Sequence, residues 1–469
     1  MCVAETSKAS VELDAPGAGT IVQLYAQGTE VELGRTIALI AESAQEVEEA
    51  LRRQTDAEQP AAVPVGRATA KAVELAAQHG IDLDSIEKAG FITAQDVEAL
   101  VATATPSAGG LLGGISTDGV TLPESFALAE EETGRLDPEF LAAPVHTLDA
   151  YRAAGAEIGD GVVLGEGAFI EAGRIVLGDG VTIGAGSSIR CDVFVAGPLT
   201  LLGDGLELRC RRAFLGANIW SDRGIRIGGG GSGDPWATLV VGDLAYLGAE
   251  AFVNVCRPVL IGREVFVTQR SMLLTHNVGH SVLEGFENRF APVVLEDRAQ
   301  IGLGAVVYAG CRVGRDAIVA SNSYVVSDIP AGKLAIGVPA RVSGPSSRPV
   351  SPARRAEVAR RMFDELHELL ELRGHDVSRE GDTLRVPEGA IAYVERLPQE
   401  YEPPRADGEV VVLTLGLAGD APEGCAVLDL VGRRVHGEGG VVLDSVREFC
   451  RKRGIRFEPG PWRYRGGLV

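Results

Sequence analysis

Two histidines lie close together in a stretch of irregular sequence, and their chemistry is the most informative in the chain. His276 and His280 both stand in residues 275–293, and Glu284 follows them in the same stretch. Histidine titrates near neutral pH, so a histidine here could take a proton from a hydroxyl or amine nucleophile. Position alone also allows a histidine that only hydrogen-bonds to a loop backbone. Glu284 could orient an imidazole, bind substrate or be solvated.

The stretch that carries these histidines interrupts a six-residue repeat of aliphatic residues. Six matches neither the alternation of an ordinary strand nor the three-to-four spacing of a helix. We interpret each unit as one face of a triangular coil, with its aliphatic side chain pointing inward and stacking on the next coil. The repeat positions are Ile158, Leu164, Ile170, Val176, Ile183, Ile189, Val195, Leu201, Leu208 and Phe214, then Ile261, Val267 and Leu273, then Leu295, Ile301, Val307, Val313, Val319 and Val325.

A second interruption of the repeat, residues 228–237, is rich in glycine. Insertions in a solenoid fall at the corners of its coils, and long loops on a rigid scaffold are where function concentrates. The pattern therefore predicts a mainly β protein, a parallel β-helix, with its functional site at these insertions.

Composition favours a solenoid and restricts the partners. The chain has 469 residues, 45% hydrophobic but only 5% aromatic, with 60 glycines, so we expect two to four folding units rich in small aliphatics and turns. A net charge of −21 argues against nucleic acid and anionic membrane surfaces as partners. Seven scattered cysteines without a CxxC pair argue against a disulfide framework and a zinc site. Neither a signal peptide nor a membrane span is evident, so we expect a soluble, cytoplasmic protein.

Residues 155–344 resemble the hexapeptide-repeat acyltransferases, whose coils wind left-handed. The segment 313–342, "VGRDAIVASNSYVVSDIPAGKLAIGVPARV", is similar to the end of the maltose, galactoside and xenobiotic acetyltransferase solenoids. The resemblance implies a left-handed parallel β-helix and transfer of an acyl group, most simply acetyl, from an acyl-CoA such as acetyl-CoA to a hydroxyl or amine. The acceptor would be a small molecule or a carrier-bound group in a specialised biosynthetic pathway. It also implies a homotrimer with active sites between neighbouring subunits.

The same resemblance assigns roles to individual residues. It makes His276 the general base and His280, with Glu284, a contact to substrate. Sugar-modifying relatives carry an asparagine and an aspartate one coil before the histidine; counting back leads here to Gly248 and Cys256, so we do not expect a simple sugar acceptor. Lys333 and Arg341 are expected to meet the phosphates of coenzyme A. The residues expected along the coenzyme are Gly304, Ala305, Ser321, Ser327, Lys333 and Arg341.

Two resemblances concern the N-terminal region. Residues 5–42 resemble the second half of a lipoyl domain, in which Lys8 of "ETSKA" matches the lipoyl-bearing lysine. The first half of that domain is absent, so we expect Lys8 to be unmodified, with lipoylation as the alternative. Residues 66–101 resemble the peripheral-subunit-binding domain of dihydrolipoamide acyltransferases, although Phe91 replaces its usual arginine. We therefore expect a small helical module over 64–104 that binds a partner protein.

The expected organisation has six parts. A partial lipoyl-like β half-domain (1–45) and a linker (46–63) precede the helical module (64–104). A second linker (105–135) leads to the β-helix with a helical cap (136–344). The C-terminal part (350–469) is expected to be an α/β domain of unread function, with helices over 354–372 and 441–452 and strands over 409–415, 426–430 and 455–457.

Two other functions compete with acyl transfer. A γ-type carbonic anhydrase shares the solenoid but needs three zinc-binding histidines from separate coil faces. Here two of the histidines, His276 and His280, stand in one loop, which argues against that enzyme. A non-catalytic trimeric scaffold, docked to an acyl-carrying complex, is the stronger alternative because the N-terminal segments resemble docking modules.

Overall fold

The computed structural model describes residues 2–6, 9–13, 20–23, 38–41, 92–93, 112, 115–127, 146–458 and 468. They belong to two compact units, Met1–Val101 and Ala102–Val469. In the first unit, β1 (Cys2–Thr6) pairs antiparallel with β2 (Ala9–Leu13), and β3 (Thr20–Gln23) with β4 (Ala38–Ala41). Lys8 and almost all of the predicted helical module lie outside the described residues.

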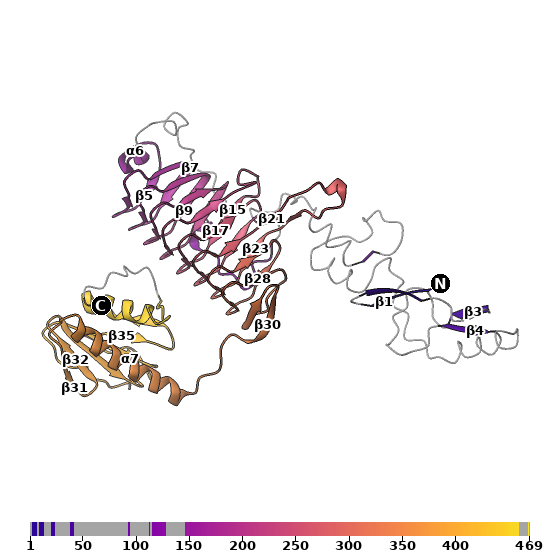
Figure 1. Cartoon of the computed structure of the whole chain (residues 1–469). Helices are drawn as coiled ribbons and strands as arrows, with labels where there is room; N and C mark the ends of the chain where they lie inside the picture. Colours follow the sequence, from indigo (N-terminus) through magenta and orange to yellow (C-terminus); the bar gives the residue numbers. More distant parts are fainter. Residues whose placement is uncertain are drawn as a thin grey trace. The chain divides into compact units, whose positions relative to one another are not determined.

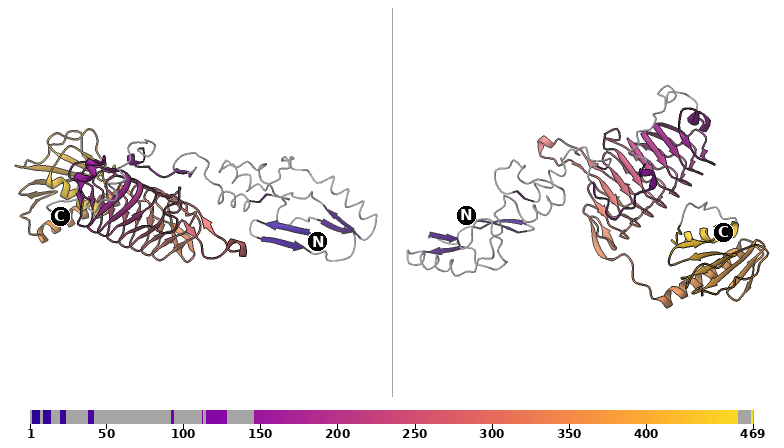
Figure 2. Two further views of the ribbon diagram at one scale, coloured as in Figure 1. Left: turned by 90° about the horizontal axis from the view of Figure 1, so that it is seen from above. Right: turned by 180° about the vertical axis from the view of Figure 1, so that it is seen from behind.

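The second unit is built on a stack of parallel coils with three faces (Figures 1 and 2). Strands of the first face form a 10-stranded sheet that ends in one antiparallel strand, β30. They are β6 (Val163–Leu164), β8 (Thr182–Ile183), β10 (Leu201–Leu202), β13 (Trp220–Ser221), β16 (Tyr246–Leu247), β19 (Phe266–Val267), β24 (Gln300–Ile301), β27 (Ile318–Val319), β29 (Lys333–Gly337) and β30 (Ala340–Pro345).

The other two faces are joined into a 14-stranded sheet because β7 and β9 run across the corner between them. The second face holds the first halves of β7 (Phe169–Leu177) and β9 (Ser188–Ala196), then β11 (Glu207–Arg209), β14 (Arg226–Gly228), β17 (Phe252–Asn254), β20 (Met272–Leu273), β25 (Val306–Val307) and β28 (Tyr324–Val325). The third face holds β5 (Glu157–Ile158), the second halves of β7 and β9, β12 (Arg212–Leu215), β15 (Thr238–Val241), β18 (Val259–Ile261), β23 (Val293–Leu295) and β26 (Arg312–Val313).

The predicted left-handed parallel β-helix is confirmed, and its core follows the six-residue repeat where the repeat is strict. The positions from Leu295 to Val325 are all fully buried in one hydrophobic core. In the earlier coils the register differs by one residue on the third face, and also at Leu201 on the first face, where Leu202 points into the core instead. Val195 and Phe214 lie on the outside of the third face, and Phe194 points inward instead. Because side chains alternate along a strand, a slip of one residue exchanges the two surfaces of the sheet.

Leu112 and residues 115–127 lie over the outside of the third face, and we call residues 115–127 the strap. Leu112, Leu122 and Phe126 pack on Val195 and Phe214, and α4 (Glu124–Ala127) places the Phe126 ring edge-on to Phe214, with ring centroids 5.3 Å apart. This packing explains why aromatic and aliphatic residues are tolerated on an outer surface. The expectation of a linker over 105–135 was wrong for this described part, which is held against the coils.

Polar contacts fix the strap further along the stack. Thr121 donates from its backbone N–H to Asp297 Oδ1 at 2.8 Å, and Arg312 donates to the carbonyl oxygen of Asp118 at 2.8 Å. At the open end of the stack, α6 (Leu148–Ala153) buries Tyr151 against the first coils, where its hydroxyl accepts a hydrogen bond from the Ile170 N–H at 2.7 Å.

The C-terminal part is an α/β domain, as predicted. Its six strands lie in the order β31 (Ser378–Glu380), β32 (Thr383–Val386), β33 (Gly389–Val394), β34 (Glu409–Thr414), β35 (Ala426–Asp429) and β36 (Arg434–His436). Helices α7 (Pro352–Leu372) and α8 (Val441–Arg451) pack on this sheet. The predicted strand over 455–457 was wrong: those residues are irregular, and only Glu458 forms an isolated bridge, to Arg434. Among the described helices, none combines the length and apolarity that crossing a membrane requires.

Candidate active site

Both interruptions of the repeat fall at the same corner, between the second and third faces. The glycine-rich loop joins β14 to β15, and two coils later the hairpin β21 (His276–Asn277) and β22 (Arg289–Phe290) joins β20 to β23. The hairpin projects from the stack, with the short helix η2 (Val282–Glu284) near its tip (Figure 1). The intervening coil passes between these two insertions and supplies the residues that meet them.

His276 is held by Asn254, which ends β17 on the intervening coil. The ring atom Nδ1 lies 2.8 Å from Asn254 Oδ1. The amide group of Asn254 is oriented by its own Nδ2, which donates to the carbonyl oxygens of Gly228 at 3.0 Å and Gly230 at 3.2 Å. Because Asn254 therefore presents an acceptor to the ring, Nδ1 must carry the hydrogen and Nε2 keeps its lone pair.

Thr275 secures the same asparagine from the other side. Its hydroxyl lies 2.5 Å from Asn254 Oδ1 and 3.1 Å from the Asn254 carbonyl oxygen. Both Thr275 and Asn254 are buried, so their polar groups are shielded from water and depend on one another. The imidazole position is thus set by a buried network rather than by the hairpin alone.

The lone pair of Nε2 faces the glycine-rich loop. A Cβ built on Gly230 would lie 3.3 Å from Nε2, which is tighter than most such contacts. A side chain at this position would crowd the ring atom that is free to accept a proton. This close approach gives a physical reason for glycine at residue 230.

Electrostatics favours the neutral imidazole. The pKa of His276 is lowered from its ordinary value of 6.5, chiefly because the ring is partly buried and also because the Arg257 guanidinium is near, while Asp234 opposes this effect. A neutral ring with a free Nε2 can act as a proton acceptor at neutral pH.

Aromatic side chains enclose the ring and its neighbouring cation. Phe290 stacks on His276, with centroids 5.7 Å apart and planes inclined by 12°. The Arg257 guanidinium contacts two rings, 4.3 Å from the centroid of Trp236 and 5.0 Å from that of Phe290. Its Nη1 is 3.5 Å from Asp234 Oδ2. A guanidinium held in this way is a preorganised contact for an anionic group.

The other loop residues predicted from sequence lie further out on the hairpin. His280 is exposed, with its ring centroid 4.6 Å from that of Phe286, and Glu284 is exposed in η2. In the described part of the chain neither hydrogen-bonds to His276. Their predicted contact with substrate therefore depends on what approaches the projecting hairpin.

The residues predicted to bind the coenzyme are divided between corners. Gly304 and Ser321 lie at the corner between the first and second faces, whereas Ser327 shares the corner of His276. Lys333 begins β29 and Arg341 lies on β30, both exposed. Ala305 is fully buried in the core, so only its backbone could meet the coenzyme, and its assignment stays a prediction.

Sequence reasoning missed Asn254, Arg257 and Trp236. Asn254 stands 22 residues before His276, and counting one coil back passes over it to Cys256. The sequence signal that could have identified it is an asparagine at the end of the strand one coil before the histidine. The expectation against a sugar acceptor rested on two missing residues, and Asn254 removes its basis for the asparagine only.

Comparison with known proteins gives a partial match. No family model matches the chain. Over 52 residues it is 48% identical to the 2,3,4,5-tetrahydropyridine-2,6-dicarboxylate N-acetyltransferase of Staphylococcus aureus, a match that covers 11% of this chain and 22% of that enzyme. The chain is similar to hexapeptide-repeat acetyltransferases. It spans less than a quarter of the length of the curated relatives that it matches.

Solved structures of hexapeptide-repeat acetyltransferases resemble the chain weakly. One, from Vibrio cholerae, is 22% identical with a TM-score of 0.25, over 28% of this chain and 72% of that one. A galactoside acetyltransferase in complex with coenzyme A is 22% identical with a TM-score of 0.22, over 28% and 63%. The lipoyl-like and subunit-binding-like resemblances stay predictions.

Proposed function

We propose that the chain is an acyl-CoA-dependent O- or N-acyltransferase, most simply an acetyltransferase. The observation that carries the proposal is the partly buried hydrogen bond between Asn254 and His276, which leaves Nε2 of a neutral imidazole free at a solenoid corner. The local identity to an N-acetyltransferase supports the same chemistry.

In the proposed reaction, Nε2 of His276 accepts a proton as the acceptor's oxygen or nitrogen attacks the thioester carbonyl. The new bond forms a tetrahedral intermediate, which collapses by breaking the carbon–sulfur bond. The departing thiolate takes the proton back from the imidazolium and leaves as the free thiol of coenzyme A. Protons and electrons balance, and the imidazole ends neutral.

We propose a homotrimer for the assembled enzyme. Within one chain the coenzyme candidates Gly304 and Ser321 lie at a different corner from His276. A groove between neighbouring subunits would bring the first corner of one chain beside the His276 corner of another, with Lys333 and Arg341 near the phosphates. Light scattering at micromolar concentration tests this, since a monodisperse monomer contradicts it.

The decisive test is turnover with acetyl-CoA. The full chain should show a raised melting temperature with acetyl-CoA and should release free thiol in the presence of small hydroxyl and amine acceptors. Acyl-CoAs of increasing chain length then define the donor. A non-catalytic scaffold would show neither binding nor thiol release.

A further inference from the structure

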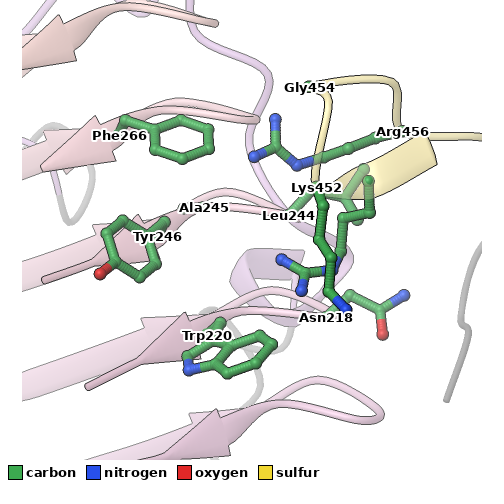
Figure 3. A pocket seen from close by; sticks show the side chains of 10 residues that line it. Asn218, Trp220, Leu244, Ala245, Tyr246, Phe266, Lys452, Gly454 and Arg456 are labelled. Atoms are coloured by element: carbon green, nitrogen blue, oxygen red, sulfur yellow. The ribbon is translucent and has the colours of Figure 1, made fainter. Parts of the chain in front are cut away.

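A second cleft lies on the first face, away from the corner of His276, and its floor is a ladder of aromatic rings. Trp220 pairs in register with Tyr246, and Tyr246 with Phe266, on three successive coils. The centroids of Tyr246 and Phe266 are 5.4 Å apart. Figure 3 shows the three rings one above another on the side of the cleft formed by the coils.

The opposite wall comes from the end of α8 and the turn after it, and it carries cations. The guanidinium of Arg451 lies 4.7 Å from the Trp220 centroid, and that of Arg456 lies 4.3 Å from the Phe266 centroid. Lys452 also lines the cleft (Figure 3). The two arginines thus cover the outer rings of the ladder, and the Tyr246 ring lies between them.

Ion pairs hold this wall against the coils, and one carboxylate among them is buried. Glu264, at the corner before β19, is 6% exposed; it accepts a hydrogen bond from Arg433 and forms an ion pair with Arg456 at 3.6 Å. Arg263 pairs with Glu458 at 2.7 Å. The cleft, about 360 Å³, therefore exists because the C-terminal domain is docked on the solenoid, and its volume is in the range of small-molecule sites.

The surface of the cleft is cationic although the chain carries a net charge of −21. No carboxylate is among the described residues that line it. Glu448, 7% exposed, lies behind the wall and holds Arg451 at 2.7 Å, while its distance to Lys452 is 3.6 Å. Lys452 is 43% exposed, so its ammonium group can turn to an anion.

The Tyr246 ring is fixed and stays neutral. Its hydroxyl donates to Asp222 Oδ2 at 2.6 Å, and burial, with the help of that carboxylate, raises the pKa of Tyr246 to about 12. The ring therefore offers a stable, uncharged stacking surface to a planar group.

We propose that this cleft binds a mononucleotide, with the base stacked on Tyr246 and the phosphate on Lys452 and the flanking arginines. A stacking ring at the floor selects a planar aromatic group. Several cations on the facing wall select a group with more than one negative charge, such as phosphate, over a single carboxylate. The ligand would bridge the solenoid and the C-terminal domain at a site separate from His276.

Isothermal titration of the full chain with AMP, UMP, adenosine and inorganic phosphate tests the proposal. We expect a mononucleotide to bind, and both adenosine and phosphate to bind at least tenfold more weakly. Tyr246→Leu and Lys452→Gln should each weaken nucleotide binding about tenfold or more, while Tyr246→Phe, which keeps the ring, should bind nearly as the parent. His276→Ala should leave nucleotide binding unchanged, which separates this cleft from the coenzyme site.

Arg453→Gln is the matched control, because the Arg453 guanidinium contacts Phe449 and Glu365 outside the cleft. Circular dichroism should confirm that each variant is folded. The proposal is overturned if the parent protein binds no nucleotide at millimolar concentration, if phosphate alone binds as tightly, or if folded Tyr246→Leu and Lys452→Gln both bind as the parent does.

Discussion

Asn254 Oδ1 accepts a hydrogen bond from Nδ1 of His276 at 2.8 Å, and the asparagine amide is itself fixed by two carbonyl oxygens of the glycine-rich loop. The relationship joins a strand end to a hairpin one coil further along. It determines which ring nitrogen is free, and the following predictions depend on it.

Replacing His276 with alanine should lower turnover by roughly two to four orders of magnitude, the usual worth of a positioned proton acceptor. Affinity for acetyl-CoA should change little, because the imidazole would meet only the thioester end. Free-thiol release measures turnover, and titration measures affinity. His280→Ala is the control and should change mainly the KM for the acceptor. If His276→Ala keeps nearly full turnover and His280→Ala is inactive, the two histidines have the opposite roles.

Replacing Asn254 with alanine should lower kcat because the ring can then adopt the wrong tautomer. Loss of one buried hydrogen bond costs roughly 1–3 kcal/mol, which corresponds to a roughly five- to 150-fold slower reaction. Thr275→Val, which removes a bond to Asn254 but keeps the Asn254–His276 bond, should have a smaller effect. Equal kcat in Asn254→Ala and the parent protein would show that the bond only supports the fold.

The rate should rise with pH through one ionisation on the acid side, because only neutral His276 can accept a proton. The pKa of His276 is lowered from 6.5, so the midpoint of this acid limb of the pH–rate profile should lie below pH 6.5. Arg257→Gln removes a nearby positive charge and should move the limb to higher pH; Asp234→Asn removes a negative charge and should move it to lower pH. Limbs that move in the opposite directions would refute this account of the site.

Glu264→Gln should loosen the C-terminal domain from the solenoid. The carboxylate is 6% exposed and pairs with Arg433 and Arg456, so the substitution removes the negative charge from both ion pairs, at a cost of about 1.5–3 kcal/mol. Limited proteolysis between the domains and thermal unfolding report the change. Glu458→Gln, at a side chain 52% exposed, is the control and should cost less than about 1 kcal/mol. Equal protease sensitivity in both variants would contradict the role of Glu264.

The solenoid could be predicted because one aliphatic residue in each six-residue unit is enough to reveal the repeat. From Leu295 to Val325 one buried aliphatic recurs at every sixth position, a spacing that neither an ordinary strand nor a helix gives. On the third face the same rule selected Val195 and Phe214, which are apolar for another reason: the strap covers them. A repeat rule cannot separate inner from outer apolar residues when both surfaces are buried.

The candidate site could be predicted only in part. His276 was found because histidine is rare in the chain and stands at an interruption of the repeat. Asn254 and Arg257 were missed because their importance comes from contacts between coils and across the glycine-rich loop. Such contacts depend on loop conformation, which residue spacing does not encode.

The strap has a consequence for how the protein unfolds. Coils of a solenoid contact only their neighbours, so each boundary between coils is a place where partial melting can stop. Phe126 of the strap packs on Phe214. Thr121 and Asp118 of the strap hydrogen-bond to Asp297 and Arg312, which lie several coils further along the stack. Coils that share no surface are thereby connected through one continuous segment, and a break between them would have to release the strap as well. Melting of this stretch should therefore proceed as a single cooperative step rather than coil by coil.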